Sequence, residues 1–287
     1  MKKILICLLL MQVLISKAET VNVVLSTTPG GTLYSNFQQL QNFLEKKNVT
    51  ILPRFKVGAE SLIAAEDASK SKPDGSTIWL TTVGGLSNAK NNNFEFEYVT
   101  MIDQPNFVLV ANPKLNIHNY NDFLSNLKSD KSYSFSYTSK GHLFSIKQLL
   151  NNVHPKTESL MVPYKGVPNL LIDLIGGVTD FSILPYSVVK DYIKDEKLVL
   201  ISSTTTLSDY PNIVVFEKLY KNWLDLNGFA VVLPKGTPKQ IVLKWQNYIK
   251  EFEEDQETKK FFMENYFTVT TFGDKYLKDR VERVYEK

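Results

Sequence analysis

Short apolar strand patterns alternate with helical patterns along almost the whole chain, and this alternation restricts the fold most. Runs such as "VNVVLST" (21–27), "STIWLTT" (76–82) and "GFAVVLP" (228–234) are typical of buried strands. Apolar residues at helical spacing follow them, for example at Phe37, Leu40 and Leu44. Short links between such elements predict an α/β fold with largely parallel sheets. Ligands of these folds bind at the carboxyl ends of the strands, where loops and helix starts gather.

The first eighteen residues, "MKKILICLLLMQVLISKA", form a segment of a different kind. Two lysines, a short apolar core and Ser16-Lys17-Ala18 predict a cleaved secretory signal peptide, and hence a periplasmic protein. The only cysteine of the sequence, Cys7, lies inside it, so we expect a mature protein without disulfides. Cleavage removes three of the 33 basic residues and leaves 30 against 30 acidic ones. A neutral mature chain gives no electrostatic reason to expect nucleic acid as a partner.

Polar loops rich in hydroxyl groups and glycines follow four of the predicted strands. They are Thr27–Thr32, Thr81–Gly85, Thr138–His142 and Tyr164–Gly166. Glycines let backbone N–H groups approach a ligand, and the start of a helix attracts a negative group. Each of these loops alone is also explained as a plain strand–helix turn, and for a lone Pro-Gly-Gly the turn is the favoured explanation. Together they favour an anion pocket built from backbone and hydroxyl donors.

The last of these loops opens the stretch "VPYKGVPNLLIDLIGGVTDF" (162–181). Its spacing predicts a helix from about Pro168 to Ile175 that packs its leucines against a sheet. Gly176-Gly177 is expected to end the helix, because glycine adopts a positive φ without strain. Asp180 is expected in the next strand, bracing neighbouring loops rather than touching an anion.

The sequence offers little support for an enzyme. His118, His142 and His154 lack metal-ligand spacing, and "PGGTLYS" (29–35) matches no nucleotide-binding motif. Ser139 in "YTSKG" is one glycine short of a nucleophile elbow, and no histidine follows His154. We therefore predict a binding protein without a metal or cofactor, and an exported serine hydrolase that uses Ser139 stays open as an alternative.

These residues resemble the Bug-type extracytoplasmic solute receptors of tripartite tricarboxylate transporters, the TctC-like family. The resemblance covers essentially the whole mature chain and keeps the order of the family's motifs. The matching stretches are Pro29-Gly30-Gly31, "IAAEDASKSKPDGSTIWL" (63–80), "FVLVANPKL" (107–115), "VPYKGVPNLLIDLIGGVTDF", "SDYPNIVVFEK" (208–218) and "VVLPKGTP" (231–238). Tyr137, Ser139 and Gly141 match part of a further glycine-rich loop.

The resemblance implies a two-lobed periplasmic-binding-protein fold, type II-like, with a ligand cleft between the lobes. Lobe one would comprise residues 19–114 and 227–287 and lobe two residues 115–226, with crossings near Lys114–Asn116 and Leu226–Gly228. Ligands of the family are usually small carboxylates, held by main-chain amides and hydroxyls and delivered to a membrane transporter. The implied ligand-binding residues are Thr27, Thr28, Gly30, Gly31, Thr32, Thr81, Thr82 and Val83 from lobe one, and Tyr137, Ser139, Gly141, Tyr164 and Gly166 from lobe two. A monomer is expected, and a sensor that signals to a membrane partner is the main alternative role.

The sequence also departs from the family pattern in three pocket loops. Tyr34 stands where an acid is common, Glu60 follows Gly58-Ala59, and Lys140 and His142 enter the glycine-rich loop of lobe two. Such larger side chains predict a smaller or reshaped site. Lys140 and His142 either add positive charge to it or point to solvent, and Lys165 is equally a pocket residue or a solvated lysine.

Overall fold

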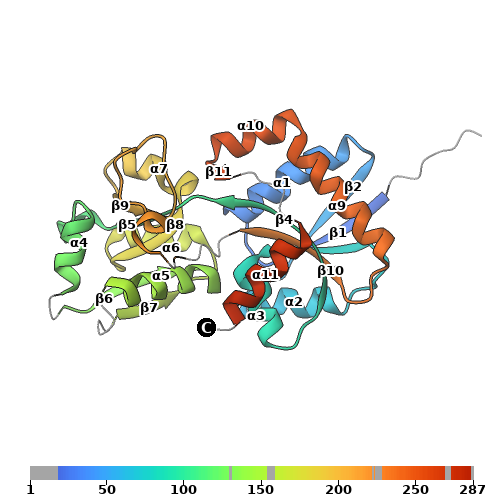
Figure 1. The fold of residues 1–287 in the computed structure, drawn as a ribbon, viewed down its shortest axis with the longest axis horizontal. Coiled ribbons are helices and arrows are strands. Elements are labelled where there is room, and N and C mark those ends of the chain that lie inside the picture. The colour runs from blue at the N-terminus through green and yellow to red at the C-terminus, as the bar shows by residue number, and fades with distance from the viewer. Residues whose placement is uncertain are drawn as a thin grey trace, which may run out of the picture.

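The computed structural model describes residues 19–128, 131–153, 159–221, 223, 228–268 and 273–285. The chain forms two lobes side by side, each a sheet with helices on both faces (Figure 1). The predicted signal peptide and His154 lie outside the described residues. None of the helices within the described ranges is both long and apolar enough to cross a lipid bilayer.

The sheet of lobe one has the strand order β11-β4-β10-β3-β1-β2. Its strands are β1 (Glu19–Leu25), β2 (Val49–Phe55), β3 (Thr77–Thr82), β4 (Phe96–Pro105), β10 (Phe229–Pro234) and β11 (Phe267–Thr268). One face is covered by α1 (Thr32–Glu45), α9 (Lys239–Glu254) and α10 (Gln256–Glu264), and the other by α2 (Leu62–Ser69), α3 (Val83–Asn91) and α11 (Asp274–Tyr285). Alternation along β1 fills both layers: Val21 and Val23 face the first, and Val24 the second.

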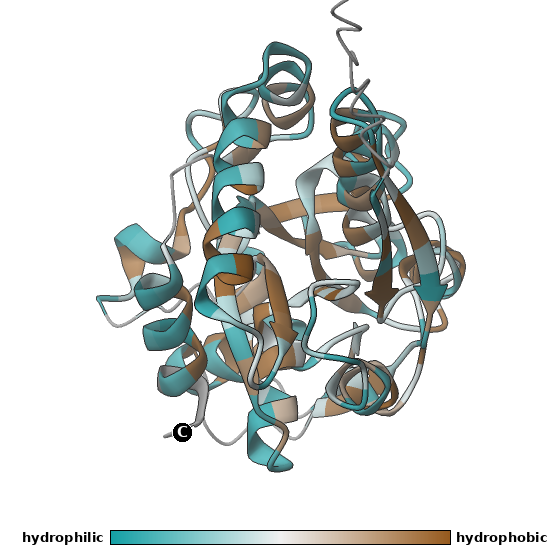
Figure 2. Ribbon diagram, turned by 90° about the vertical axis from the view of Figure 1, so that its right-hand side faces the viewer, coloured by the Kyte–Doolittle hydropathy of each residue, from teal (hydrophilic) through white to brown (hydrophobic). Residues whose placement is uncertain are grey.

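The sheet of lobe two has the order β7-β6-β8-β5-β9. Its strands are β5 (Phe107–Ala111), β6 (Tyr133–Tyr137), β7 (Ser159–Pro163), β8 (Phe181–Pro185) and β9 (Val199–Ser203). One face carries α4 (Tyr120–Leu127), α5 (Lys140–Val153) and α8 (Phe216–Leu219), and the other α6 (Val167–Gly176) and α7 (Tyr186–Lys194). Two short 3₁₀ turns, η1 (Ala59–Ser61) and η2 (Pro113–Leu115), complete the elements. Apolar strands lie inside and polar helix faces outside (Figure 2).

The α6 prediction is confirmed. The helix buries Leu170, Leu171 and Leu174 against the sheet. Gly177 caps it with φ +84, the left-handed conformation that glycine adopts without strain. Asp180 lies one residue before β8, and not in the strand as was expected; its carboxylate accepts hydrogen bonds from the backbone N–H and the hydroxyl of Ser134, both at 2.8 Å. Asp180 therefore ties β6 to β8, as expected of a bracing acid.

The chain first crosses between the lobes at Asn106, before the predicted crossing near Lys114–Asn116. β4 belongs to the first sheet, whereas β5 pairs with β8 and β9 in the second. Lobe one therefore ends at about Pro105 and not at Lys114. An apolar run such as β5 is buried in either sheet, so its sequence does not reveal which sheet it joins. On the way back, β10 starts at Phe229 in the first sheet, and Leu226 and Asn227 lie outside the described residues.

Both sheets are mixed rather than largely parallel. β1, β2 and β3 run parallel to each other, as do β6, β7 and β8. β10 and β5 run antiparallel to their neighbours. The reason is the crossing itself, since a strand that starts at the boundary between the lobes runs opposite to the strands that end there.

Candidate functional site

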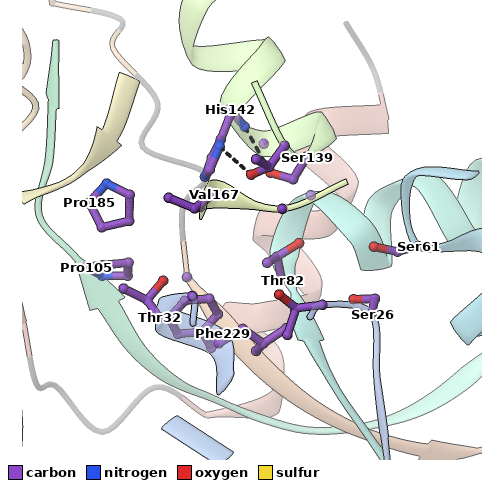
Figure 3. A pocket seen from close by; sticks show the side chains of 18 of the residues that line it. Ser26, Thr32, Ser61, Thr82, Pro105, Ser139, His142, Val167, Pro185 and Phe229 are labelled. Atoms are coloured by element: carbon purple, nitrogen blue, oxygen red, sulfur yellow. Dashed lines mark hydrogen bonds between the residues drawn. The ribbon is translucent and has the colours of Figure 1, made fainter. Parts of the chain in front are cut away.

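A cavity of about 70 Å³ lies between the lobes, where the strands of both sheets end (Figure 3). Lobe one contributes Ser26, Thr27, Gly31, Thr32, Leu33, Ser61, Thr82, Gly84, Pro105, Gly228 and Phe229. Lobe two contributes Phe107, Thr138, Ser139, Gly141, His142, Lys165, Gly166, Val167 and Pro185. Because both lobes supply walls, the cavity exists only while the lobes are together.

Four helices point their N-termini at this cavity. α1 and α3 come from lobe one, and α5 and α6 from lobe two; residues of the first turn or the cap of each line the space. The first N–H groups of a helix have no partner inside it, and the helix dipole places partial positive charge there. Four converging N-termini therefore create a site for negative charge from backbone groups alone.

Two of these N-termini are left uncapped by side chains. The caps of α1 and α6 are Gly31 and Gly166, which offer no side-chain acceptor. At α3 the Thr82 hydroxyl accepts from the Gly85 N–H at 3.0 Å, and at α5 the Ser139 hydroxyl accepts from the His142 N–H at 3.3 Å. The amides that start α1 and α6 are thus the backbone donors best placed to meet a ligand.

Glycines bring the backbones of the two lobes into direct contact beside the cavity. A Cβ at Gly84 of α3 would lie 2.3 Å from the backbone N of Gly141 in α5. A Cβ at Gly166 would lie 2.7 Å from the Thr28 hydroxyl of the opposite lobe. These approaches need residues without side chains, which explains the glycine-rich loops at the strand ends.

The cationic side chains near the site differ in their partners and in their charge. Lys140 forms an ion pair with Glu60 of the other lobe, with Nζ and Oε2 2.6 Å apart. Among the described residues that line the cavity, Lys165 is the one lysine. His142 lines it too, but burial lowers the pKa of its imidazole to about 4, so the ring is neutral at physiological pH. Its Nδ1 lies 3.0 Å from the Thr138 hydroxyl.

The segment that carries Glu60 has an unusual backbone. Ala59, Glu60 and Ser61 have φ values of 45°, 52° and 79° in succession. Non-glycine residues seldom adopt this conformation, which costs of the order of 1 kcal/mol or more each. The Asn88 amide holds the turn by donating to the Glu60 carbonyl at 3.0 Å. The turn places Ser61 on the cavity and Glu60 against Lys140.

Seven of the thirteen predicted ligand residues line the cavity. They are Thr27, Gly31, Thr32, Thr82, Ser139, Gly141 and Gly166. Thr28 and Gly30 lie just beside them, because Thr28 faces Gly166 and Gly30 faces Pro168 of α6 across the gap between the lobes.

The other four predicted residues do not line the cavity. Thr81 and Val83 are fully buried in lobe one, and the Val83 N–H donates to the Gly228 carbonyl at 2.9 Å. Tyr137 is buried in the core of lobe two. The Tyr164 hydroxyl donates to Asp173 at 2.6 Å, and burial together with this carboxylate raises its pKa to about 12. Strand alternation explains Thr81, which points into the core while Thr82 faces the cavity.

The structure also shows where the residues that depart from the family pattern lie. The Tyr34 ring packs beside Phe37 and Phe55 in lobe one, with centroid distances of 6.0 Å to each. Lys140 is held by Glu60, and Lys165 lines the cavity. Among the described residues, no cluster of three or more acids, histidines or cysteines could hold a metal ion.

Sequence reasoning missed one whole side of the cavity. Pro105, Phe107, Pro185 and Phe229 form an apolar wall at the crossing between the lobes. Each lies at the end or start of a strand, and Phe107 is the register partner of Pro185. Nothing in the local sequence distinguishes these residues from ordinary core residues. A proline at the strand end was no guide either, because β4, β7, β8 and β10 all end in proline and only Pro105 and Pro185 line the cavity.

The fold and the cavity together define a two-lobed solute-binding protein. The family model of the tripartite tricarboxylate transporter family receptor matches residues 37–282, and the chain belongs to this family. It is 24% identical over 248 residues to Protein BugT of Bordetella pertussis, covering 82% of this chain and 76% of that protein.

Solved structures share the architecture. MatC from Rhodopseudomonas palustris, determined with bound malate, has a TM-score of 0.81 at 16% identity, covering 93% of this chain and 98% of that one. An R. palustris protein determined with adipate has a TM-score of 0.83 at 19% identity, covering 93% and 94%. The periplasmic binding protein BugD has a TM-score of 0.81 at 19% identity, covering 93% and 94%. The predicted family and the two-lobed fold are thus confirmed.

Proposed function

We propose that this receptor is exported to the periplasm, closes on a small carboxylate and delivers it to a transporter of the tripartite tricarboxylate type. The observation that carries the proposal is the convergence of four helix N-termini, two from each lobe, on one cavity. A carboxylate there receives fixed N–H donors from both lobes at once, and so favours the closed arrangement of the lobes.

Membership of the receptor family and the neighbours solved with malate and adipate support a carboxylate as the ligand. Thr27, Gly31, Thr32, Thr82, Ser139, Gly141 and Gly166 are the residues we assign to it. Export would be accompanied by removal of residues 1–18, which intact-mass measurement of the periplasmic protein would test. The receptor would act as a monomer and need no cofactor.

Calorimetry against a panel of mono- and dicarboxylates tests the binding function, with Gly31→Val as the diagnostic variant. A valine at this cap would fill space beside the Thr27 hydroxyl, which lies 3.6 Å from the position of its Cβ. We expect loss of binding with an unchanged melting temperature. Gly176→Val is the matched control, since nothing lies within 4 Å of its Cβ position. If no carboxylate binds more tightly than buffer salts, or if Gly31→Val binds like the wild type, the site assignment is wrong.

The hydrolase alternative gains no support from the geometry. The Ser139 hydroxyl accepts from the backbone amide of His142, while the imidazole Nδ1 of His142 meets Thr138 instead. A serine nucleophile needs its base within hydrogen-bond reach. We therefore propose that the protein is not an enzyme, and ester turnover that disappears in Ser139→Ala would contradict this.

A membrane pull-down separates delivery from signalling. Capture of the transporter's membrane subunits by the ligand-loaded receptor supports delivery. Capture of a membrane sensor in their place would support the signalling role.

A further inference from the structure

The imidazole of His142 is held in a defined orientation at the wall of the cavity. The residue lies in the first turn of α5 and is only 7% exposed. The Thr138 hydroxyl lies 3.0 Å from Nδ1, and the ring packs edge-on against Phe107, with centroids 5.0 Å apart. In Figure 3 the ring extends from α5 towards the cavity, next to Val167. Two neighbours therefore fix the direction in which its other nitrogen points.

That other nitrogen, Nε2, has no hydrogen-bond partner among the described residues. It also differs from unpaired nitrogens that the protein encloses completely, such as Nε1 of Trp79, because Nε2 stays accessible. A histidine that served only the core would bond or fully enclose both nitrogens. An accessible, unpaired nitrogen on a side chain that is otherwise buried indicates a contact point for a ligand atom.

The bond to Thr138 decides which nitrogen carries the proton. In a neutral imidazole one nitrogen donates and the other accepts. Among the described residues, Nδ1 of His142 is the only partner of the Thr138 hydroxyl, so the hydroxyl hydrogen has no other acceptor within that part of the chain. Thr138 therefore donates to Nδ1, and the ring proton resides on Nε2. Burial lowers the pKa of this imidazole to about 4, so Nε2 is a neutral N–H donor at physiological pH.

A neutral donor suits a site that already has positive potential. The N-termini of the four helices supply this potential from backbone groups. A further buried cation would need its own counter-charge, whereas a neutral N–H group is costly only when it lacks a partner. No described residue supplies a partner for Nε2, and an oxygen atom of an anion in the cavity would do so.

We propose that His142 is a ligand-binding residue whose Nε2–H donates a hydrogen bond to an oxygen atom of the bound anion and so contributes to specificity. This inference rests on the proposed receptor function and adds a side-chain contact to the backbone donors of α1 and α6. The oxygen belongs to a carboxylate, carbonyl or hydroxyl group, because a CH₂ group at this place would leave a buried N–H unpaired. The histidine that departs from the family pattern thus serves recognition.

Two substitutions separate ligand contact from a structural role. The amide of His142→Gln is long enough to place an N–H where Nε2 lies. His142→Asn is one CH₂ group shorter, so its amide reaches Thr138 but not the cavity. Calorimetry uses whichever of acetate, succinate, malate and adipate binds the wild type most tightly, and thermal unfolding checks that both variants fold. We expect an affinity within about threefold of the wild type for His142→Gln, and an affinity about 10- to 100-fold lower for His142→Asn.

The reverse order would contradict the proposal. If His142→Asn binds this carboxylate as tightly as His142→Gln does, the imidazole acts through Thr138 alone and the contact with the ligand is refuted.

Nitrogen-15 NMR of the imidazole tests the same contact in a protein with an unaltered site. Comparison with His118→Gln and His154→Gln assigns the His142 signals by elimination. We expect a neutral ring protonated at Nε2, with Nε2 and its proton shifting when the carboxylate saturates the protein. A ring protonated at Nδ1, or Nε2 signals that do not move on saturation, would overturn the proposal and leave the receptor function intact. Binding of none of the four carboxylates to the wild type would overturn the receptor function as well.

Discussion

Replacement of Gly84 by alanine should hold the two lobes apart. The Cβ of an alanine at this position would lie 2.3 Å from the backbone N and 2.7 Å from the Cα of Gly141 in the opposite lobe. Real Cβ atoms essentially never approach closer than 3.0 Å, so the two backbones must separate by at least 0.7 Å. Both contacting atoms belong to backbone, and no side-chain rotation relieves the overlap.

The expected cost falls on the closed state alone. Overpacking of this kind costs about 1–3 kcal/mol, which corresponds to about a 5- to 150-fold loss of affinity. In the open state the methyl group meets no opposing lobe, and alanine is the better helix former by about 0.5–1 kcal/mol. Gly84→Ala should therefore bind ligand more weakly and yet melt at the same or a higher temperature.

Three measurements separate this effect from misfolding. Calorimetry with the carboxylate of the panel that binds most tightly gives the affinity, thermal unfolding gives the stability, and small-angle scattering gives the radius of gyration, which should increase. Gly176→Ala is the control, because a Cβ there meets nothing within 4 Å. Wild-type affinity and an unchanged radius of gyration in Gly84→Ala would refute the role of the Gly84–Gly141 contact. A lowered melting temperature would show that the clash acts within one lobe instead.

Three further predictions concern two buried polar groups, His142 and Glu253, and the half-buried Asp180. Burial lowers the pKa of His142 to about 4. Between pH 6.5 and 4 the imidazole is therefore protonated in the unfolded chain but neutral in the folded protein, and the free energy of unfolding should fall as the pH drops through this range. In His142→Gln that fall should be smaller by up to about 1.4 kcal/mol per pH unit in denaturant titrations, and equal pH profiles would contradict it. Burial raises the pKa of Glu253 to about 8, with Asp103 adding repulsion, so the wild type should lose stability from pH 4.5 to 8. Glu253→Gln should therefore stabilise the protein by about 1 kcal/mol or more at pH 8 and less at pH 5; a gain that does not grow with pH would count against it. Asp180→Ala leaves the Ser134 amide without its carboxylate and should cost about 1–3 kcal/mol in urea unfolding with ligand affinity unchanged, whereas weakened binding would place Asp180 in the site.

Much of the architecture can be predicted from local patterns. Alternating strands and helices identify the α/β class, and the α6 helix with its Gly177 cap is readable from leucine spacing and one glycine pair. The same holds for the loops: Gly31, Thr82, Ser139 and Gly166 all line the cavity. Strand-end position is a local property, because it depends on where apolar runs stop and glycines begin.

Local sequence patterns do not show which distant segments pair with each other or which side of a strand faces the cavity. β5 reads as a buried strand in any sheet, and only its pairing with β8 and β9 assigns it to lobe two. Thr81 and Thr82 are equivalent in sequence, and the direction of the pleat buries one and exposes the other to the cavity. Neither fact can be read from neighbouring residues.

The sequence by itself determined the class of fold, the family and the chemistry of the loops, because these depend on residue types within a few positions of each other. The tertiary structure decided the shape and charge of the site. It brought Glu60 to Lys140 and Gly84 to Gly141, and it gathered the helix N-termini and the apolar wall around one cavity. These contacts join the two lobes, and a contact between lobes depends on how two separately folded sheets meet rather than on any local pattern.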